Sequence, residues 1–447
     1  MTTWITDSIK EKSLEELKKL IAIPSVNRTE GVQSHPPFGK DIDAALKQTL
    51  ELCESLGMKT YYDPEGFYGY ADYGEGSETV GVLCHLDVVS PGDKSLWNSE
   101  PFTATIIDEV VYGRGTQDDK GPTIAALYAF KAVVDSGKTF NRKIRFIFGT
   151  DEEILWRCMD HYHKHEETPD FGFVPDSTFP LTYAEKELLQ LQLVGPGSDK
   201  IALELGEAPN VVPGKAIYDK EDSEEVAHIL EEKGIKFEKS GDTITVLGKS
   251  VHAKDSNSGI NAINQLAKAL NEVYAHPVFS FLAEKVGDEG NGRAIFGKVE
   301  DDVTGELTFN VGKLKINKNE SVLDIDMRIP VKYSKEDLVP KLEKIANEYG
   351  LEYKEFDWLP SLYVPKDSSL VQTLLNIYRD KTGDEREPFV SGGATYARQM
   401  ENFVAFGAHF PESPSLEHQE NEGIKLEDFY KAMDIYAETI NKFCCEE

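Results

Sequence analysis

Acidic and imidazole side chains recur in this sequence where short apolar runs end. Five such clusters stand out: CHLDVV with His85 and Asp87, QDDKG with Asp118 and Asp119, TDEE with Glu152 and Glu153, FVPD with Asp176, and LEHQ with His418. A single His or Asp in a loop is most often a surface residue. Burying several carboxylates together without a partner, however, costs several kcal/mol per charge. Divalent cations would offset that repulsion, so the pattern predicts a metal site.

The types of ligand indicate which metals and which chemistry fit. Mixed His and carboxylate ligands without Cys suit zinc, manganese or cobalt in a hydrolytic site. Two zinc ions that share one carboxylate need about five protein ligands plus water. The sequence supplies five candidates: His85, Asp118, Glu153, Asp176 and His418. Glu152 is then left free beside a ligand, which is a suitable place for a base that activates water.

Composition narrows the classes of protein to consider. The 447 residues carry a formal net charge of -31, which argues against nucleic-acid and anionic-membrane partners. No stretch approaches the roughly 18 uncharged apolar residues of a membrane span. The five cysteines fit neither a disulfide framework nor a C-x-x-C zinc site, and no secretory signal is evident at the start. We therefore expect a cytoplasmic protein with neither nucleic-acid nor membrane partners.

Strands and helices alternate around the candidate ligands. Residues 79–89 form a largely apolar run typical of a strand buried on both faces, and 143–149 and 170–176 are also strand-like. Helical patterns cover 41–58 and 118–137. This alternation predicts a parallel or mixed sheet covered by helices, and such sheets present ligands at the carboxyl ends of their strands.

The middle of the chain has a different pattern. From about residue 187, period-two runs such as LLQLQLVG mix with helical patterns, which indicates an α+β insertion. From about residue 366 the first pattern returns, and the chain ends in an amphipathic helix. We therefore predict an α/β protein of two parts. Residues 1–186 and 366–447 would form one domain, and 187–365 an inserted domain of two α+β halves.

As a set, the motifs resemble the di-zinc peptidase family of aminoacylases, glutamate carboxypeptidases, carnosinases and bacterial dipeptidases. The set comprises HLDVV, GRGTQDDKG, DEE, a later Asp, GKSVHAKDSNSGINA and a late His, and it runs nearly from end to end. The long insertion, with PNVVPGKA, DMRIPV, SGGATYAR and HQENE, is most similar to the dipeptidase V branch of Xaa-His and bacterial dipeptidases. The resemblance implies a mixed-sheet zinc-peptidase catalytic domain with an inserted α+β lid domain.

The resemblance also implies a role for each matched residue of the catalytic domain. The metal ligands would form two sets that share Asp118: His85 with Asp176 for one zinc, and Glu153 with His418 for the other. A cis peptide would join Asp118 to Asp119, and Asp87 would orient the ring of His85. Glu152 would be the general base.

Five further positions match family residues that meet the substrate. His252 matches the histidine that donates to the developing oxyanion. Asn210 and Arg328 match lid positions that contact substrate, and Arg328 is suited to grip a C-terminal carboxylate bidentately. Gly392 and Gly393 would let backbone approach the substrate.

The resemblance therefore implies a zinc-dependent dipeptidase, a metallopeptidase hydrolase with two Zn²⁺ per chain and Mn²⁺ or Co²⁺ as substitutes. It would cleave small peptides with a free amino group and a free C-terminal carboxylate, using a water held between the metals and Glu152 as base. Because the insertion is large, we expect a monomer. One alternative is an N-acyl amino acid deacylase of the same family. The other, a non-enzymatic binding protein, is disfavoured because Glu152 and all five ligands are present.

Overall fold

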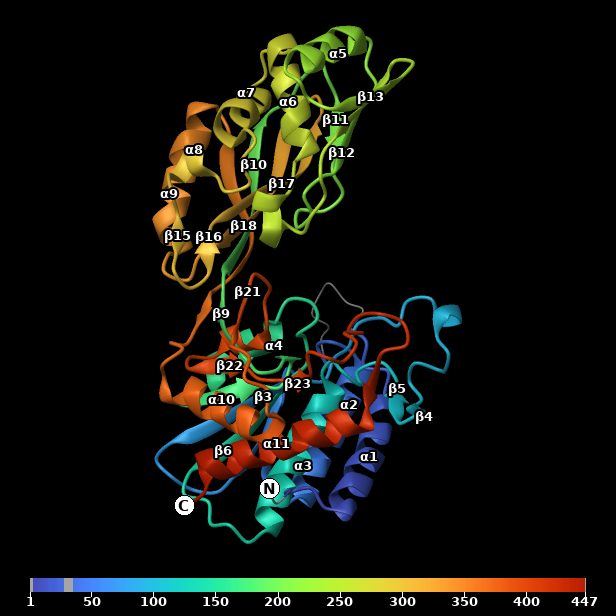
Figure 1. Cartoon of the computed structure of the whole chain (residues 1–447), viewed down its shortest axis with the longest axis vertical. Coiled ribbons are helices and arrows are strands. Elements are labelled where there is room, and N and C mark those ends of the chain that lie inside the picture. The colour runs from blue at the N-terminus through green and yellow to red at the C-terminus, as the bar shows by residue number, and fades with distance from the viewer. Residues whose placement is uncertain (1–2, 28–34, 447) are drawn as a thin grey trace. The chain divides into compact units, whose positions relative to one another are not determined.

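The structure is a computed structural model that describes residues 3–27 and 35–446 (Figure 1). The chain forms two compact units. Unit 1 comprises Met1–Tyr183, Val364–Phe389 and Thr395–Glu447, and unit 2 comprises Ala184–Tyr363 and Val390–Ala394. The predicted division placed residues 390–394 in the catalytic domain. These residues group with unit 2 because they form hydrogen bonds with it. For example, Lys186 N donates to Ser391 O over 3.2 Å.

A mixed sheet is the centre of unit 1. Its strands lie in the order β1 (Lys59–Tyr62), β2 (Gly69–Tyr73), β6 (Lys143–Gly149), β3 (Thr79–His85), β7 (Phe171–Val174), β22 (Phe403–Ala405) and β9 (Thr182–Glu185). The middle strands β6, β3, β7 and β22 run parallel, whereas β1, β2 and β9 pair antiparallel with their neighbours. All of β3 after Thr79 is buried, as its apolar run predicts. The predicted α/β class is confirmed.

Helices and two small sheets complete unit 1. The helices are α1 (Asp7–Ile21), α2 (Lys40–Ser55), α3 (Lys120–Asp135), α4 (Arg157–His165), α10 (Ser369–Thr382) and α11 (Leu426–Cys444). Helix α11 packs along α3, as Figure 1 shows, and both contribute to one hydrophobic core with β3 and β6. The small sheets are β24 (Gly423–Lys425) with β5 (Val110–Tyr112) and β4 (Thr105–Ile107), and β23 (Ala408–His409) with β8 (Ser177–Thr178).

Unit 2 is built on two antiparallel sheets. The larger has the order β11 (Leu203–Leu205), β17 (Thr308–Ile316), β18 (Glu320–Ile329), β10 (Glu187–Pro196) and β19 (Glu352–Leu359). The smaller has the order β12 (Lys215–Tyr218), β14 (Thr243–Leu247) and β13 (Phe237–Ser240), and a hairpin joins β15 (Glu300–Asp301) to β16 (Gly305–Glu306). The helices are α5 (Ser223–Glu232), α6 (Ala262–Val273), α7 (Pro277–Phe281), α8 (Arg293–Phe296) and α9 (Lys335–Glu348). A second hydrophobic core, separate from that of unit 1, holds these elements together.

Among the described residues, no helix combines the length and the apolar character needed to cross a membrane.

Candidate metal centre

Three neighbouring parallel strands of unit 1 deliver candidate ligands to one edge of the sheet. His85 is the last residue of β3 and lies opposite Gly149, the last residue of β6. The TDEE segment follows Gly149, and Asp176 comes two residues after β7 ends. Because the carboxyl ends of parallel strands meet at the same edge, side chains from three distant segments come together there.

Two groups of side chains share Asp118. In the first group, His85 Nε2 lies 2.8 Å from Asp118 Oδ1 and 3.6 Å from Asp176 Oδ2. In the second, His418 Nε2 lies 2.9 Å from Asp118 Oδ2 and 3.0 Å from Glu153 Oε2. Within the described part of the chain, these are the groups of three or more side chains that could hold a metal ion. They contain the five ligands that the sequence predicted, and each oxygen of Asp118 faces a different group.

The donor atoms of the first group fit a cation. His85 Nε2 and Asp118 Oδ1 are buried and make no hydrogen bond, although they lie 2.8 Å apart. A buried acceptor without a donor is costly, and a divalent cation between the two atoms would satisfy both. Imidazole nitrogen with carboxylate oxygen is also a donor set that zinc, manganese and cobalt accept.

The charges of the centre favour cations as well. Burial and the charge of Asp118 raise the pKa of Glu153 to about 7, and the same two causes raise the pKa of Asp176. Burial alone would raise the pKa of Asp118, but its contacts to His418 and His85 hold it below its usual value. Hydrogen bonds to Asp118 and Glu153 raise the pKa of His418 to about 11. Carboxylates crowded in this way need positive charge, from protons or from bound cations.

Glu152 lies next to the two groups but belongs to neither. Desolvation raises its pKa well above the usual value; His85 opposes this shift, and the charges of Asp176 and Glu153 add to it. A carboxyl group with a raised pKa beside a candidate metal centre is suited to exchange protons during hydrolysis.

Asp87 has a second role that the sequence did not reveal. Its backbone oxygen lies 2.9 Å from His85 Nδ1, whereas its carboxylate is 3.6 Å from that atom. The fully buried carboxylate accepts instead from the backbone nitrogens of Glu152 and Glu153, each over 3.1 Å. Asp87 therefore fixes the ring of His85 through its backbone oxygen and the segment that carries Glu152 and Glu153 through its side chain.

Two other acids support the same edge. The peptide bond between Asp118 and Asp119 is cis, and Asp119 Oδ2 accepts from His85 N over 3.1 Å. Asp151, which sequence reasoning passed over, accepts from Arg157 Nε over 2.6 Å and from Arg157 Nη2 over 2.7 Å. This ion pair ties the TDEE segment to the start of α4. Its only signal in the sequence is the extra acid of that motif.

The predicted substrate residues lie in unit 2. Arg328 is 4% exposed, and its Nε and Nη2 donate to Asp326 over 2.7 and 2.9 Å. The Nε and Nη2 atoms of the guanidinium group, which we expected to grip a substrate carboxylate, therefore bind Asp326 instead. Asp326 lies two residues away on the same side of β18. The remaining Nη1 donates to Gly392 O over 3.0 Å. A Cβ added to Gly392 would lie 2.8 Å from Cβ of Lys254, so a larger residue there would need Lys254 to move.

His252 is exposed and has a defined tautomer in unit 2. Lys254 N donates to His252 Nδ1 over 3.1 Å, so Nδ1 is an acceptor. Partial desolvation and the charge of Arg328 lower the pKa of His252, which favours the neutral ring. The proton of a neutral ring then lies on Nε2, which is free to donate. Asn210 lies beside this segment, because Ala253 N donates to Asn210 O over 2.9 Å. Gly393 follows Gly392 in the 390–394 segment.

Comparison with known sequences places the chain among peptidases. Residues 81–442 match the family model described as Peptidase family M20/M25/M40. A Staphylococcus aureus (strain MW2) protein named "Putative dipeptidase" is 35% identical over 463 residues, covering 98% of each chain. A protein of the same name from strain USA300 is 34% identical with the same coverage.

Solved structures share the fold. The M20 family metallo-carboxypeptidase of Sulfolobus solfataricus matches with a TM-score of 0.60 and 21% identity over 96% of this chain and 98% of its own. The aminoacylhistidine dipeptidase of Vibrio alginolyticus matches with a TM-score of 0.61 and 14% identity over 96% of each chain.

Proposed function

The chain belongs to peptidase family M20/M25/M40, and from this premise we propose that it is a zinc-dependent dipeptidase with two metal ions in unit 1. One observation carries the proposal: the two carboxylate oxygens of Asp118 face two different ligand groups, 2.8 Å from His85 and 2.9 Å from His418. A carboxylate placed in this way is suited to bridge two cations. Glu152, which precedes Glu153 in the sequence, belongs to neither group.

The chemistry divides between the cations and the chain. Bound cations would polarise the scissile carbonyl and lower the pKa of the attacking water. Glu152 would accept the proton of that water and deliver it to the leaving amine. Asp87 would fix the positions of Glu152 and Glu153 relative to His85, since its carboxylate accepts hydrogen bonds from the backbone nitrogens of both acids. From unit 2, His252 would donate its Nε2 proton to the developing oxyanion.

The substrate class rests on the relatives. Proteins named as dipeptidases align with nearly the whole chain at 34–35% identity. We propose peptides of two residues with a free amino group and a free C-terminal carboxylate. Because Asp326 pairs with the Nε and Nη2 atoms of Arg328, we propose that Arg328 acts mainly by holding the carbonyl of Gly392, and that Asn210 contacts the substrate.

A substrate panel tests the proposal. The metal-free protein is loaded with zinc, manganese or cobalt and assayed with free dipeptides, tripeptides, and N-acetyl and N-succinyl amino acids. We expect hydrolysis of free dipeptides and little hydrolysis of the others. Preferential release of the acyl group would identify a deacylase instead. A protein that binds the metals and cleaves none of these compounds would contradict an enzymatic role.

A further inference from the structure

The two histidine ligands are supported in different ways. His85 ends a buried strand, is fully buried, and has its Nδ1 held by the backbone oxygen of Asp87 over 2.9 Å. His418 lies between β23 and β24 with a positive φ of 63°, and its side chain is 56% exposed. Its Nε2 meets Asp118 and Glu153, but no described residue bonds to its Nδ1. The position of His418 must therefore depend on how its segment of backbone is held.

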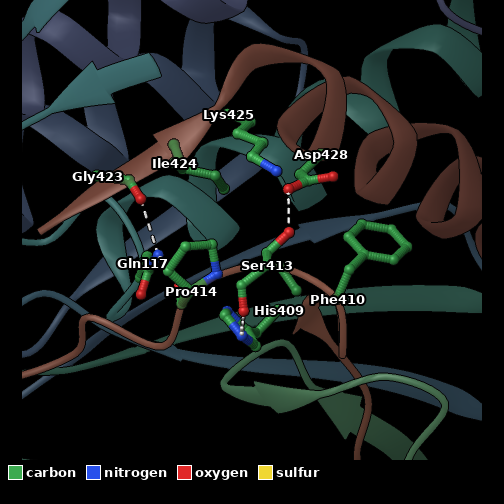
Figure 2. A pocket seen from close by; sticks show the side chains of 10 residues that line it. Gln117, His409, Phe410, Ser413, Pro414, Gly423, Ile424, Lys425 and Asp428 are labelled. Atoms are coloured by element: carbon green, nitrogen blue, oxygen red, sulfur yellow. Dashed lines mark hydrogen bonds between the residues drawn. The ribbon is translucent and has the colours of Figure 1, made fainter.

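Gln117, the residue before the shared Asp118, holds that segment from one side. Its Nε2 donates to Pro414 O over 3.0 Å and to Gly423 O over 2.7 Å. Its Oε1 accepts from Leu416 N over 2.9 Å. Figure 2 shows the Gln117 side chain reaching Gly423 beside Pro414. One amide side chain thus bonds to the backbone both before and after His418.

Glu422 makes the reciprocal contact from the segment of His418. Its carboxylate is fully buried and accepts from Gln117 N over 2.7 Å, from Gly115 N over 3.0 Å and from Asp118 N over 3.3 Å. Arg114 Nη1 donates to the same carboxylate over 2.7 Å. Four donors from residues 114–118 therefore converge on one side chain.

A hollow remains beside these bonds, on the side that Figure 2 shows. A pocket lies there, lined by Gln117, Pro414, Phe410 and Ile424 among others. The segments 114–118 and 413–423 are thus joined by the hydrogen bonds of Gln117 and Glu422, with Gly113 N donating to Glu422 O over 2.9 Å and the short pairing of β24 with β5 beside them.

We propose that Gln117 and Glu422 are positioning residues that lock the segment of His418 onto the segment of Asp118 and so set the second metal position. This inference rests on the metal centre of the proposed function. It predicts an asymmetry between the two positions. The position of His85 and Asp176 depends on β3 and β7, whereas the position of His418 and Glu153 depends on the lock.

Cobalt titration tests the asymmetry without any substrate. Co²⁺ alone is added to the metal-free full-length chain, and binding is followed by visible absorption and by calorimetry. Gln117→Met keeps the length of the side chain and removes its three hydrogen bonds. We expect the first equivalent to bind as in the unchanged protein, and the second to bind about 10- to 100-fold more weakly, as for other residues that support ligands. Glu422→Gln is the second variant and should weaken the same equivalent.

The matched control is Gln419→Met. Gln419 is exposed, lies next to His418, and donates within its own segment to Ser415 O over 3.3 Å. We expect this variant to bind both equivalents normally. Normal binding of the second equivalent by Gln117→Met would overturn the proposal. Equal weakening of both equivalents, with a lower unfolding temperature of the metal-free chain, would also overturn it. A protein that shows the asymmetry but cleaves no dipeptide would refute only the proposed function.

Discussion

Neighbouring acids in this centre have different surroundings, although the sequence presents them as pairs. Asp118 directs its two oxygens to the two ligand groups, whereas Asp119 accepts from the backbone of His85 and from Thr123. Glu153 contacts His418, and Glu152 belongs to neither group. At the residue scale, the direction in which the backbone turns decides which acid joins a candidate ligand group and which stays outside both groups.

The role of Glu152 can be separated from metal binding. Replacing Glu152 with Gln keeps its size and leaves the five ligands in place, so we expect unchanged metal content. General acid–base groups contribute about 10²- to 10⁴-fold to rate, and we expect a loss in kcat of that order. Steady-state kinetics with a free dipeptide and metal analysis of the same sample provide the measurement. Glu51→Gln, at an exposed site of α2, is the control. Normal turnover by the Glu152 variant would show that another group is the base.

At the scale of elements, parallel strands and one long helix shape unit 1. Strands β3, β6 and β7 bring residues 85, 149 and 174 to the same edge, which the apolar runs and their polar ends predict. Helix α11 covers residues 426–444, where the sequence predicts an amphipathic helix. Its stripe of Phe429, Met433, Tyr436 and Ile440 is buried, because these residues face α3 and the core of unit 1.

The packing of α11 gives a prediction about stability. Met433 is fully buried, and Met433→Ala removes side-chain atoms from the core and leaves a cavity. We expect the free energy of unfolding to fall by about 2–5 kcal/mol. Glu427→Ala changes an exposed residue in the first turn of the same helix and should cost well under that amount. Chemical denaturation of both variants measures the difference, and equal stability would show that the stripe does not pack as described.

For the whole molecule, the two units have separate hydrophobic cores, and all five candidate ligands belong to unit 1. Metal removal should therefore destabilise one unit. Binding one ion at a free concentration of about 100 Kd stabilises the native state by about 2.7 kcal/mol. We expect a chelator to lower the calorimetric transition of unit 1 and to leave that of unit 2 in place. Hydrogen exchange measured residue by residue would assign each calorimetric transition to a unit. A single transition that shifts as a whole when the metal is removed would contradict the prediction.

The number of chains in the molecule is a separate prediction. We expect a monomer, because the insertion of about 180 residues is large enough to replace the contribution of a partner subunit. Light scattering should give a mass near 50.0 kDa. A mass near twice that value would contradict the prediction.

Much of the metal centre was predictable from the sequence because its signals are local. His and acidic side chains are the ligand types considered for a hydrolytic zinc site, and apolar runs mark the strands whose ends present such residues. This reasoning identified His85, Asp118, Glu153, Asp176 and His418, which the structure brings into two groups. The Arg328–Asp326 pair was also within reach, because residues two apart on a strand share a face.

Only the tertiary structure decided how these residues are held. Glu422 follows the Asp118 segment by about three hundred residues, and no local pattern indicates that its carboxylate collects four donors there. The same is true of Gln117 and of the 390–394 segment, which joins unit 2. Side-chain type and period are properties of neighbouring residues, so the sequence alone identifies the candidate ligands. Hydrogen bonds between distant segments depend on the path of the whole chain, so the fold determines their support.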